Sequence, residues 1–112
     1  MTARNVLGDD LEPCGTDPLT GWYRDGCCNT GSEDQGSHTV CAVVTDEFLT
    51  HQRSIGNDLS TATPQYHFPG LVAGDRWCGT AVNWLRAHHD GMAAPVVLAS
   101  THVRALEIVP LV

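Results

Sequence analysis

The sequence predicts a small α+β domain, with two or more short strands packed against two main helices and long ordered loops. A chain of 112 residues fits one domain that can bury a modest core. Two short apolar runs have the length of buried strands, and two other segments carry start and stop signals of helices. No repeat or Pro/Gly/Ser-rich linker divides the chain, so we expect a single domain over residues 1–112.

The first element is a long loop over residues 11–37. Turn signals such as Thr20-Gly21 and Asp25-Gly26 follow one another closely in it. A loop of this length inside a compact domain is usually either functional or disordered. The aromatic residues Trp22 and Tyr23 and three cysteines favour an ordered, functional loop.

A strand over residues 38–45 and a helix come next. The continuous apolar centre of the strand indicates burial on both faces. The helix opens at Asp46, with either Thr45 or Asp46 as its N-cap and with acids at its positive end. Arg53 in the last turn and Gly56 beyond it predict where this helix stops.

The second half of the chain alternates irregular and regular segments. Residues 57–74 are predicted to be irregular, since they contain Pro64, Pro69 and Gly70. A second helix is predicted from an N-cap at Asp75 to a stop at Gly91. Its apolar stripe at helical spacing consists of Trp77, Ala81, Trp84, Leu85 and His88. Residues 95–99 predict a second buried strand, and residues 101–109 predict a helical turn followed by an extended tail, with another strand as the alternative.

The charge pattern excludes several classes of function. The net charge is −7 and the chain contains no lysine, so nucleic-acid backbones and anionic membranes are repelled on average. The absence of lysine also excludes Schiff-base catalysis and a P-loop. No apolar run approaches the length of a membrane span, and the N-terminus lacks the features of a secretory signal. We therefore expect a cytoplasmic protein, and its reducing surroundings and five cysteines, an odd number, argue against a disulfide scaffold.

A reactive thiol is the first hypothesis for the site. Cys78 falls in the first turn of the second predicted helix, where the helix dipole and the nearby Arg76 would stabilise a thiolate. A histidine would accept its proton and an acid, one of Asp25, Glu33, Asp34 and Asp75, would orient that histidine. The alternative is that Cys78 packs as a small apolar side chain. The candidate catalytic residues are Cys78, Cys28, His38, His102 and Asp25.

A zinc site is the second hypothesis. Tetrahedral zinc takes four Cys or His ligands, usually supplied as close pairs such as C-x₂-C, which this chain lacks. The spacing His38-x-x-Cys41 resembles half of such a site, although residues three apart on a regular strand face opposite ways. Cys41 also fits an inert core thiol, since it lies in an apolar strand. The candidate ligands are Cys14, Cys27, Cys28, Cys41 and His38.

Three hypotheses on function follow from these observations. The leading one is thiol-dependent chemistry on a small molecule, with the long loop folded over the start of the second helix. The second is a module that binds zinc or another metal. The third is a non-catalytic domain that binds a ligand or a partner and whose cysteines only pack.

Several distinctive motifs are spread nearly end to end along the chain, at residues 5–8, 12–14, 16–21, 24–31, 36–41, 56–59, 68–71, 74–78 and 101–102. Together they resemble one uncharacterised bacterial family, domain of unknown function two-two-three-seven. The resemblance implies no activity, but it does imply that all five cysteines, His38 and His102 occur together. Similar proteins commonly have a second cysteine two positions after Cys78, where this chain has Thr80.

Overall fold

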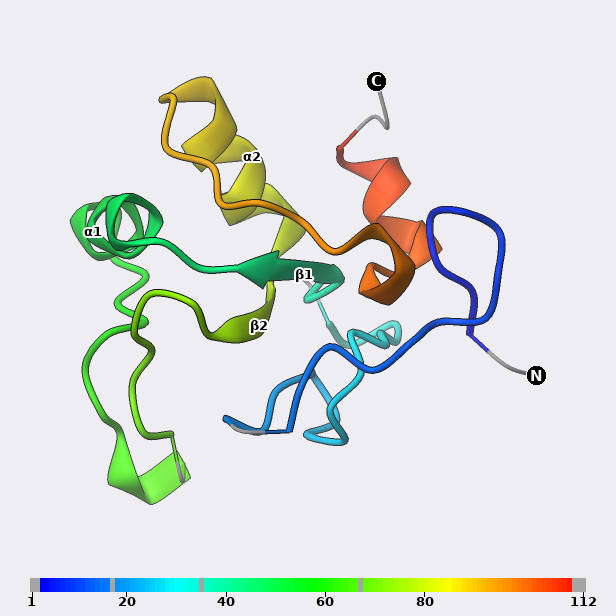
Figure 1. The fold of residues 1–112 in the computed structure, drawn as a ribbon, viewed down its shortest axis with the longest axis horizontal. Helices are drawn as coiled ribbons and strands as arrows, with labels where there is room; N and C mark the ends of the chain where they lie inside the picture. Colours follow the sequence, from blue (N-terminus) through cyan, green and yellow to red (C-terminus); the bar gives the residue numbers. More distant parts are fainter. Residues whose placement is uncertain (1–2, 17, 35, 67, 110–112) are drawn as a thin grey trace.

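A two-stranded antiparallel sheet lies at the centre of the molecule; its strands are joined through residues 44–75, and we call the strand pair the hairpin for short. The computed structural model describes residues 3–16, 18–34, 36–66 and 68–109. Strand β1 (Val40–Val43) pairs with strand β2 (Arg76–Gly79), and Figure 1 shows the remaining segments arranged around this pair. Alternate strand residues face opposite sides, so the register gives the hairpin two different faces. The pair Ala42 and Trp77 belongs to one face, and the pair Cys41 and Cys78 belongs to the other.

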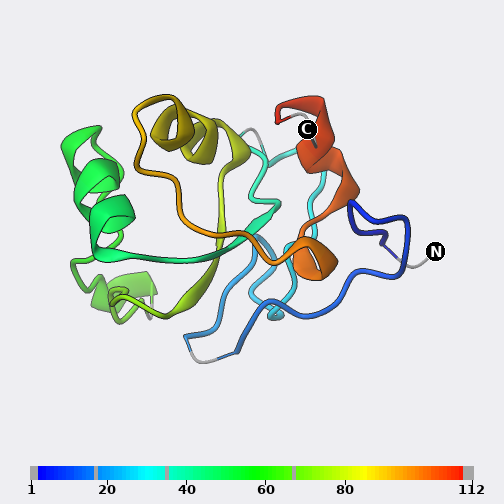
Figure 2. The same ribbon diagram turned by 45° about the horizontal axis from the view of Figure 1, so that its top comes forward.

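Two nine-residue helices cover the first of these faces. Helix α1 (Asp46–Ser54) begins at Thr45, whose side chain accepts a hydrogen bond from the Phe48 N–H at 3.1 Å. Helix α2 (Ala81–His89) begins in the same way at Thr80. Figure 2 shows the two helices side by side. They enclose an apolar core with Ala42 and Trp77, and its other buried members are Val44, Phe48, Leu49, Leu71, Ala87 and Ala94.

The start of the second helix differs from the prediction. The segment Arg76–Gly79 is a strand, so Asp75 is not an N-cap; its carboxylate accepts a hydrogen bond from the Val72 N–H at 3.0 Å and closes a turn. The true cap is Thr80, four residues before Trp84. The prediction was wrong here because Trp77 and Ala81 have helical spacing although they lie in different elements.

The predicted strand over residues 95–99 is correct only in part. Val96 forms a single antiparallel bridge with Ala42, on the edge of β1 opposite to β2, and a 3₁₀ turn (Leu98–Ser100) follows at once. A second 3₁₀ segment (Val103–Glu107) confirms the helical turn expected after residue 101. Residues 108 and 109, where the extended tail was expected to end, form a turn and a bend.

The long N-terminal loop covers the second face of the hairpin. Its described residues form turns and isolated bridges, and a helix is absent among them. Glycine is required at Gly21, where φ is +103° and an added Cβ would lie 2.4 Å from the Cys27 carbonyl oxygen. No helix in the described part of the chain is long and apolar enough to cross a membrane.

Candidate functional site

The four buried cysteines come together on the loop side of the hairpin. Cys41 and Cys78 are directly opposite each other on β1 and β2, and opposed residues of an antiparallel pair project from the same face. The loop brings Cys14 and Cys28 against that face, and all four side chains are at most 2 % exposed. Sulfur atoms far apart in the sequence therefore meet in one place, as the leading hypothesis expects.

These cysteines form two disulfides, Cys14–Cys41 and Cys28–Cys78, each linking the loop to the hairpin. The expectation that the chain lacks a disulfide scaffold was therefore wrong. The Cα atoms of the bonded residues are 5.7 and 5.2 Å apart, within the usual range for a disulfide. The odd cysteine count leaves only Cys27 unbonded, and the doublet Cys27-Cys28 contributes one sulfur to the pairing.

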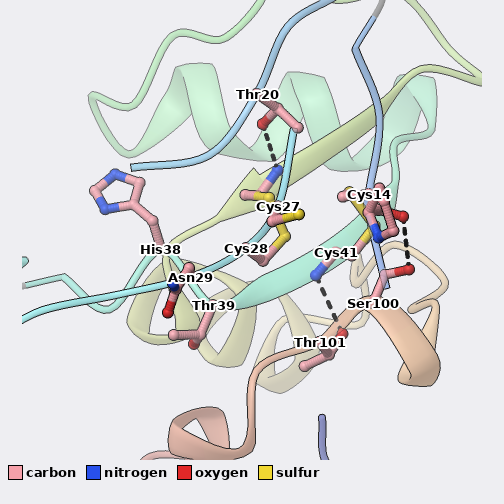
Figure 3. The surroundings of a disulfide bond; sticks show 12 residues. Cys14, Thr20, Cys27, Cys28, Asn29, His38, Thr39, Cys41, Ser100 and Thr101 are labelled. Atoms are coloured by element: carbon pink, nitrogen blue, oxygen red, sulfur yellow. Dashed lines mark hydrogen bonds between the residues drawn. A yellow bond between two sulfur atoms is a disulfide. The ribbon is translucent and has the colours of Figure 1, made fainter. Parts of the chain in front are cut away.

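The environment of Cys78 also differs from the one predicted for a reactive thiol. It lies in the middle of β2 and not in a first helical turn, so no helix dipole acts on it. Its backbone N–H donates to the Thr20 hydroxyl at 2.8 Å, and the Cys41 N–H donates to the Thr101 hydroxyl at 3.1 Å. Figure 3 shows these two bonds on either side of the sulfur cluster. The threonines fix the backbone of both hairpin cysteines.

Cys27 is half-buried, and its surroundings oppose a thiolate. Burial raises the pKa of the Cys27 thiol, and the negative charge of Asp25 raises it further. The Asp25 carboxylate accepts a hydrogen bond from the Cys27 N–H at 3.0 Å, so Asp25 serves as a turn residue. The structure does not place Asp25 against His38 or His102 as the orienting acid.

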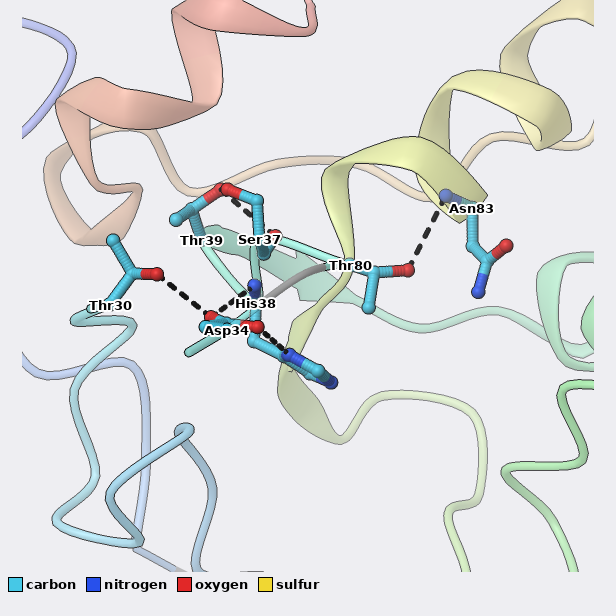
Figure 4. Close-up of polar contacts among 7 residues, drawn as sticks. All are labelled: Thr30, Asp34, Ser37, His38, Thr39, Thr80 and Asn83. Carbon is cyan, nitrogen blue, oxygen red and sulfur yellow. Dashed lines mark hydrogen bonds and ion pairs between the residues drawn. The ribbon is translucent and has the colours of Figure 1, made fainter. Parts of the chain in front are cut away.

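His38 is instead oriented by Asp34. The Asp34 side chain is inaccessible to solvent, and its Oδ1 lies 2.5 Å from Nδ1 of His38, whose ring is about one third exposed. The other oxygen, Oδ2, accepts hydrogen bonds from the Thr30 hydroxyl at 2.9 Å and the His38 N–H at 2.7 Å. Figure 4 shows Thr30 and the His38 ring on opposite sides of the carboxylate. Asp34 is one of the four acids that the sequence offered for this role.

These contacts set the charge of Asp34 and the tautomer of His38. Burial alone would raise the pKa of Asp34, but the hydrogen bonds from His38 and Thr30 outweigh it and hold the pKa below its usual value. An ionised Asp34 accepts the Nδ1 proton of His38. Nε2 then faces away from Asp34, and among the described residues it has no hydrogen-bond partner.

Two adjoining hollows lie beside His38. The smaller, about 40 Å³, is lined by His38, Gln52, Asn57 and Thr80 together with apolar side chains. The larger, about 180 Å³, is lined by Arg24, Leu59, Thr63, Phe68 and Trp77. Leu59 and Trp77 line both hollows, so the two adjoin, and we refer to them together as the groove, with His38 at its polar part and Phe68 at its aromatic part.

Two aromatic contacts organise the groove. The Trp22 ring stacks on the His38 ring with centroids 5.4 Å apart, and the Arg24 guanidinium lies 5.1 Å from the centre of a Trp77 ring. The sequence showed Trp22 as a loop residue but gave no sign of Arg24 or of the groove, because these residues meet Trp77 only after the loop folds. Arg24 has φ +54°, an uncommon left-handed conformation that aims its side chain.

His102 has a structural role. It is the N-cap of the last 3₁₀ segment, where its Nδ1 accepts the Arg104 N–H at 3.0 Å, and its side chain is buried. Burial lowers the pKa of His102, and the charge of Arg104 acts in the same direction. Its backbone N–H donates to the Thr39 carbonyl, so His102 ties the C-terminal segment to the residue before β1.

The predicted metal ligands are only partly brought together. The metal-ligating atoms of Cys14, Cys28 and Cys78 all lie within 4.8 Å of one another, and this is the one such group found among the described residues. It includes Cys78, which the predicted set lacks, and it does not include Cys27 or His38. Figure 3 shows the His38 ring pointing away from the sulfur atoms.

A small α+β domain with two disulfides and a histidine-lined groove is thus the class that fold and site define. The family described as "Uncharacterized protein conserved in bacteria (DUF2237)" matches residues 4–112, and the chain belongs to this family. The match confirms the resemblance noted from the sequence motifs. No curated protein matches the chain.

Proposed function

We propose that this chain is a ligand-binding domain that holds a small anionic molecule in the groove beside His38 and exchanges a proton with it. One observation carries the proposal: a buried, ionised Asp34 holds Nδ1 of His38, and the His38 side chain also lines a hollow. A histidine oriented by a carboxylate is the usual arrangement for proton transfer to a bound molecule. The proposal is the third function of the sequence analysis, with an acid–base residue added.

The lining of the groove favours a flat anion. The Arg24 guanidinium supplies the positive charge, and Phe68 and Trp77, with ring centroids 5.1 Å apart, supply aromatic surface. The combined hollow is smaller than the pockets of about 300–1,000 Å³ that hold drug-sized ligands. A carboxylate or similar group near Arg24, attached to a single ring, matches this size and chemistry.

The surroundings of the cysteines favour a structural role for them over thiol chemistry. A nucleophilic thiol must be accessible and ionised, whereas four of the cysteines are buried in disulfides and the pKa of Cys27 is raised. We keep the cytoplasm as the proposed compartment. Disulfides are commonly reduced there, which makes the reduced form of this chain relevant.

An NMR titration with benzoate tests the proposal. We expect benzoate at millimolar concentration to shift the indole N–H signal of Trp77 and the ring signals of His38, and the neutral isostere benzyl alcohol to shift them far less. Replacing Arg24→Gln should weaken benzoate binding by about tenfold, equivalent to 1.4 kcal/mol. Arg86→Gln, an exposed arginine on α2, is the matched control and should bind normally.

A second pair of variants separates binding from proton exchange. Asp34→Asn removes the charged acceptor of the Nδ1 proton, so the pH dependence of benzoate binding should change while the Trp77 shift persists. The His38→Gln variant lacks the imidazole ring, so any pH dependence of benzoate binding that the ring causes should be absent from this variant. Absence of any shift at Trp77 and His38 with benzoate, or equal binding of benzyl alcohol, would contradict the proposal.

A further inference from the structure

We infer that the two disulfides, once reduced, form a four-cysteine site for a tetrahedral divalent metal ion such as Zn²⁺. The ligands are Cys14, Cys28, Cys41 and Cys78. This set differs from the one that the sequence suggested, because it takes Cys78 in place of Cys27 and His38. It lies apart from the groove beside His38 and does not depend on the ligand bound there.

The backbone arrangement resembles a preformed cage. Cys41 and Cys78 are opposed across β1 and β2 and project from the same face, as two ligands supplied by a hairpin. Cys14 and Cys28 approach that face from the loop and supply the other two. Four cysteines are a usual ligand set of a structural zinc site, although here they are brought together by the fold and not by close spacing in the sequence.

Three of the four sulfurs, those of Cys14, Cys28 and Cys78, are already close enough to require only small movements. Zinc–sulfur bonds of about 2.3 Å in a tetrahedron place the sulfur atoms about 3.8 Å apart. The sulfurs of Cys14, Cys28 and Cys78 already lie within 4.8 Å of one another, and Cys41 is bonded to Cys14. Cleavage lets each bonded pair open by rotation about the side chains, while the unbonded sulfurs draw closer.

Hydrogen bonds also support the backbone around the site. Thr20 and Thr101 accept the N–H groups of Cys78 and Cys41, and the Ser100 hydroxyl donates to the Pro13 carbonyl at 3.0 Å, beside Cys14. No sulfur atom takes part in these contacts, so reduction does not itself remove them, and a bound metal ion would replace the disulfides as the cross-link between loop and hairpin. The four thiols would otherwise share a dry cluster, since each cysteine is at most 2 % exposed.

The metal site forms in two steps, reduction of both disulfides and then binding of the ion. Each disulfide takes two electrons and two protons from a dithiol reductant, whose own sulfurs become a disulfide, so two such exchanges give four thiols. Zn²⁺ then forms four Zn–S bonds, and the four thiol protons are released to the buffer. The reverse conversion needs two molecules of a disulfide oxidant, which together take four electrons from the thiolates and four protons from the buffer, so that both protein disulfides form again and the metal ion is released.

Cobalt(II) spectroscopy on the phosphine-reduced, full-length chain under nitrogen tests the inference. We expect one Co²⁺ per chain, with the visible bands of tetrahedral cobalt and a sulfur-to-metal charge-transfer band, and displacement of Co²⁺ by Zn²⁺. Four protons should be released per metal ion in weakly buffered solution near pH 7, where the thiols of the reduced, metal-free chain are protonated. A reduced chain that gives no tetrahedral spectrum, or binds less than one Co²⁺, would overturn the inference.

Matched variants identify the ligands. Cys78→Ser should lose the four-sulfur spectrum, whereas Cys27→Ser, at the neighbour of Cys28, and His38→Gln should keep it unchanged. Loss of the spectrum in Cys27→Ser or His38→Gln would overturn the assignment in favour of the set suggested by the sequence. Because Cys78→Ser can weaken folding, circular dichroism of the reduced wild type is recorded as well: Zn²⁺ should raise its melting temperature, and an unchanged melting temperature would count against the site.

Discussion

The helical side and the loop side of the central hairpin share the same two strands but are held together differently. On the helical side, residues such as Phe48, Leu49 and Trp77 form a continuous apolar core. On the loop side the buried cluster consists of four cysteines, and Val97 is the one partly buried hydrophobic residue in the described part of the chain that packs against it. The loop lacks the regular hydrogen bonding of a helix or sheet, so ordering it costs backbone entropy that few apolar contacts offset. Cross-links reduce that cost by restricting the unfolded chain.

Because the cross-links hold the loop side, replacing a disulfide should have the largest effect on the free energy of unfolding. In the oxidised protein, changing Cys28 and Cys78 to Ala should lower the free energy of unfolding by about 4 kcal/mol, and the corresponding change at Cys14 and Cys41 by about 3.5 kcal/mol. The order follows from sequence separations of 50 and 27 residues. Urea unfolding followed by circular dichroism measures both.

Cys27→Ala is the control for these double variants. This half-buried residue has no disulfide, so its replacement should change stability by less than about 1 kcal/mol. Hydrogen exchange should show that the disulfide variants lose protection first in the loop and last in α1 and α2. If α1 loses protection before the loop does, the two sides of the hairpin are not stabilised separately.

A substitution in the apolar core tests the helical side of the hairpin. Phe48→Ala removes a side chain that is 3 % exposed in the apolar core and should cost about 3–4 kcal/mol. Both disulfides should still form, so thiol titration in denaturant should find one free thiol per chain. The control is Val82→Ala on the outer face of α2, where the side chain is 44 % exposed and the cost should be small. A Phe48→Ala variant that unfolds no more readily than Val82→Ala would show that the cysteines dominate on both sides.

The sequence predicted the helical side more closely than the loop side. A local signal, the Thr45 cap followed by acids, predicts the start of α1 correctly. Strand β2 was missed because it spans only Arg76–Gly79 and its partner β1 lies more than thirty residues earlier, so no local pattern distinguishes it from the start of the helix. The Thr80 cap was visible as a residue, but it competed with Asp75 as a starting point.

The site was predictable to a similar, limited degree. His38 was recognised as a proton acceptor, and Asp34 was among its four possible partners, but sequence spacing alone does not choose between four acids in a loop. The disulfides were not predicted because an expected reducing compartment was given more weight than the cysteines themselves. Pairing depends on which sulfurs meet in space, and the loop brings Cys14 and Cys28 to β1 and β2 through contacts that span up to fifty residues.

The smallest predicted effect concerns His102, which joins the C-terminal segment to the hairpin. Its folded pKa is depressed, chiefly by burial, so the fold favours the neutral ring, which accepts the Arg104 N–H. The stability that depends on the neutral ring is fully present above the unfolded pKa of about 6.5 and is lost as the pH falls from there through the folded pKa.

His102→Asn tests this contribution, because asparagine keeps an N-cap acceptor but does not titrate. At pH 7.5 the variant should lie within about 1 kcal/mol of the wild type. Between pH 6.5 and 5 it should lose less stability than the wild type, as measured by urea midpoints. His89→Asn, at the exposed end of α2, should retain the wild-type pH dependence. The outcome against this prediction is that the urea midpoints of His102→Asn and the wild type fall in parallel down to pH 5. Protonation of His102 would then not weaken the link between the last 3₁₀ segment and Thr39, and any acid sensitivity of the loop side would arise elsewhere.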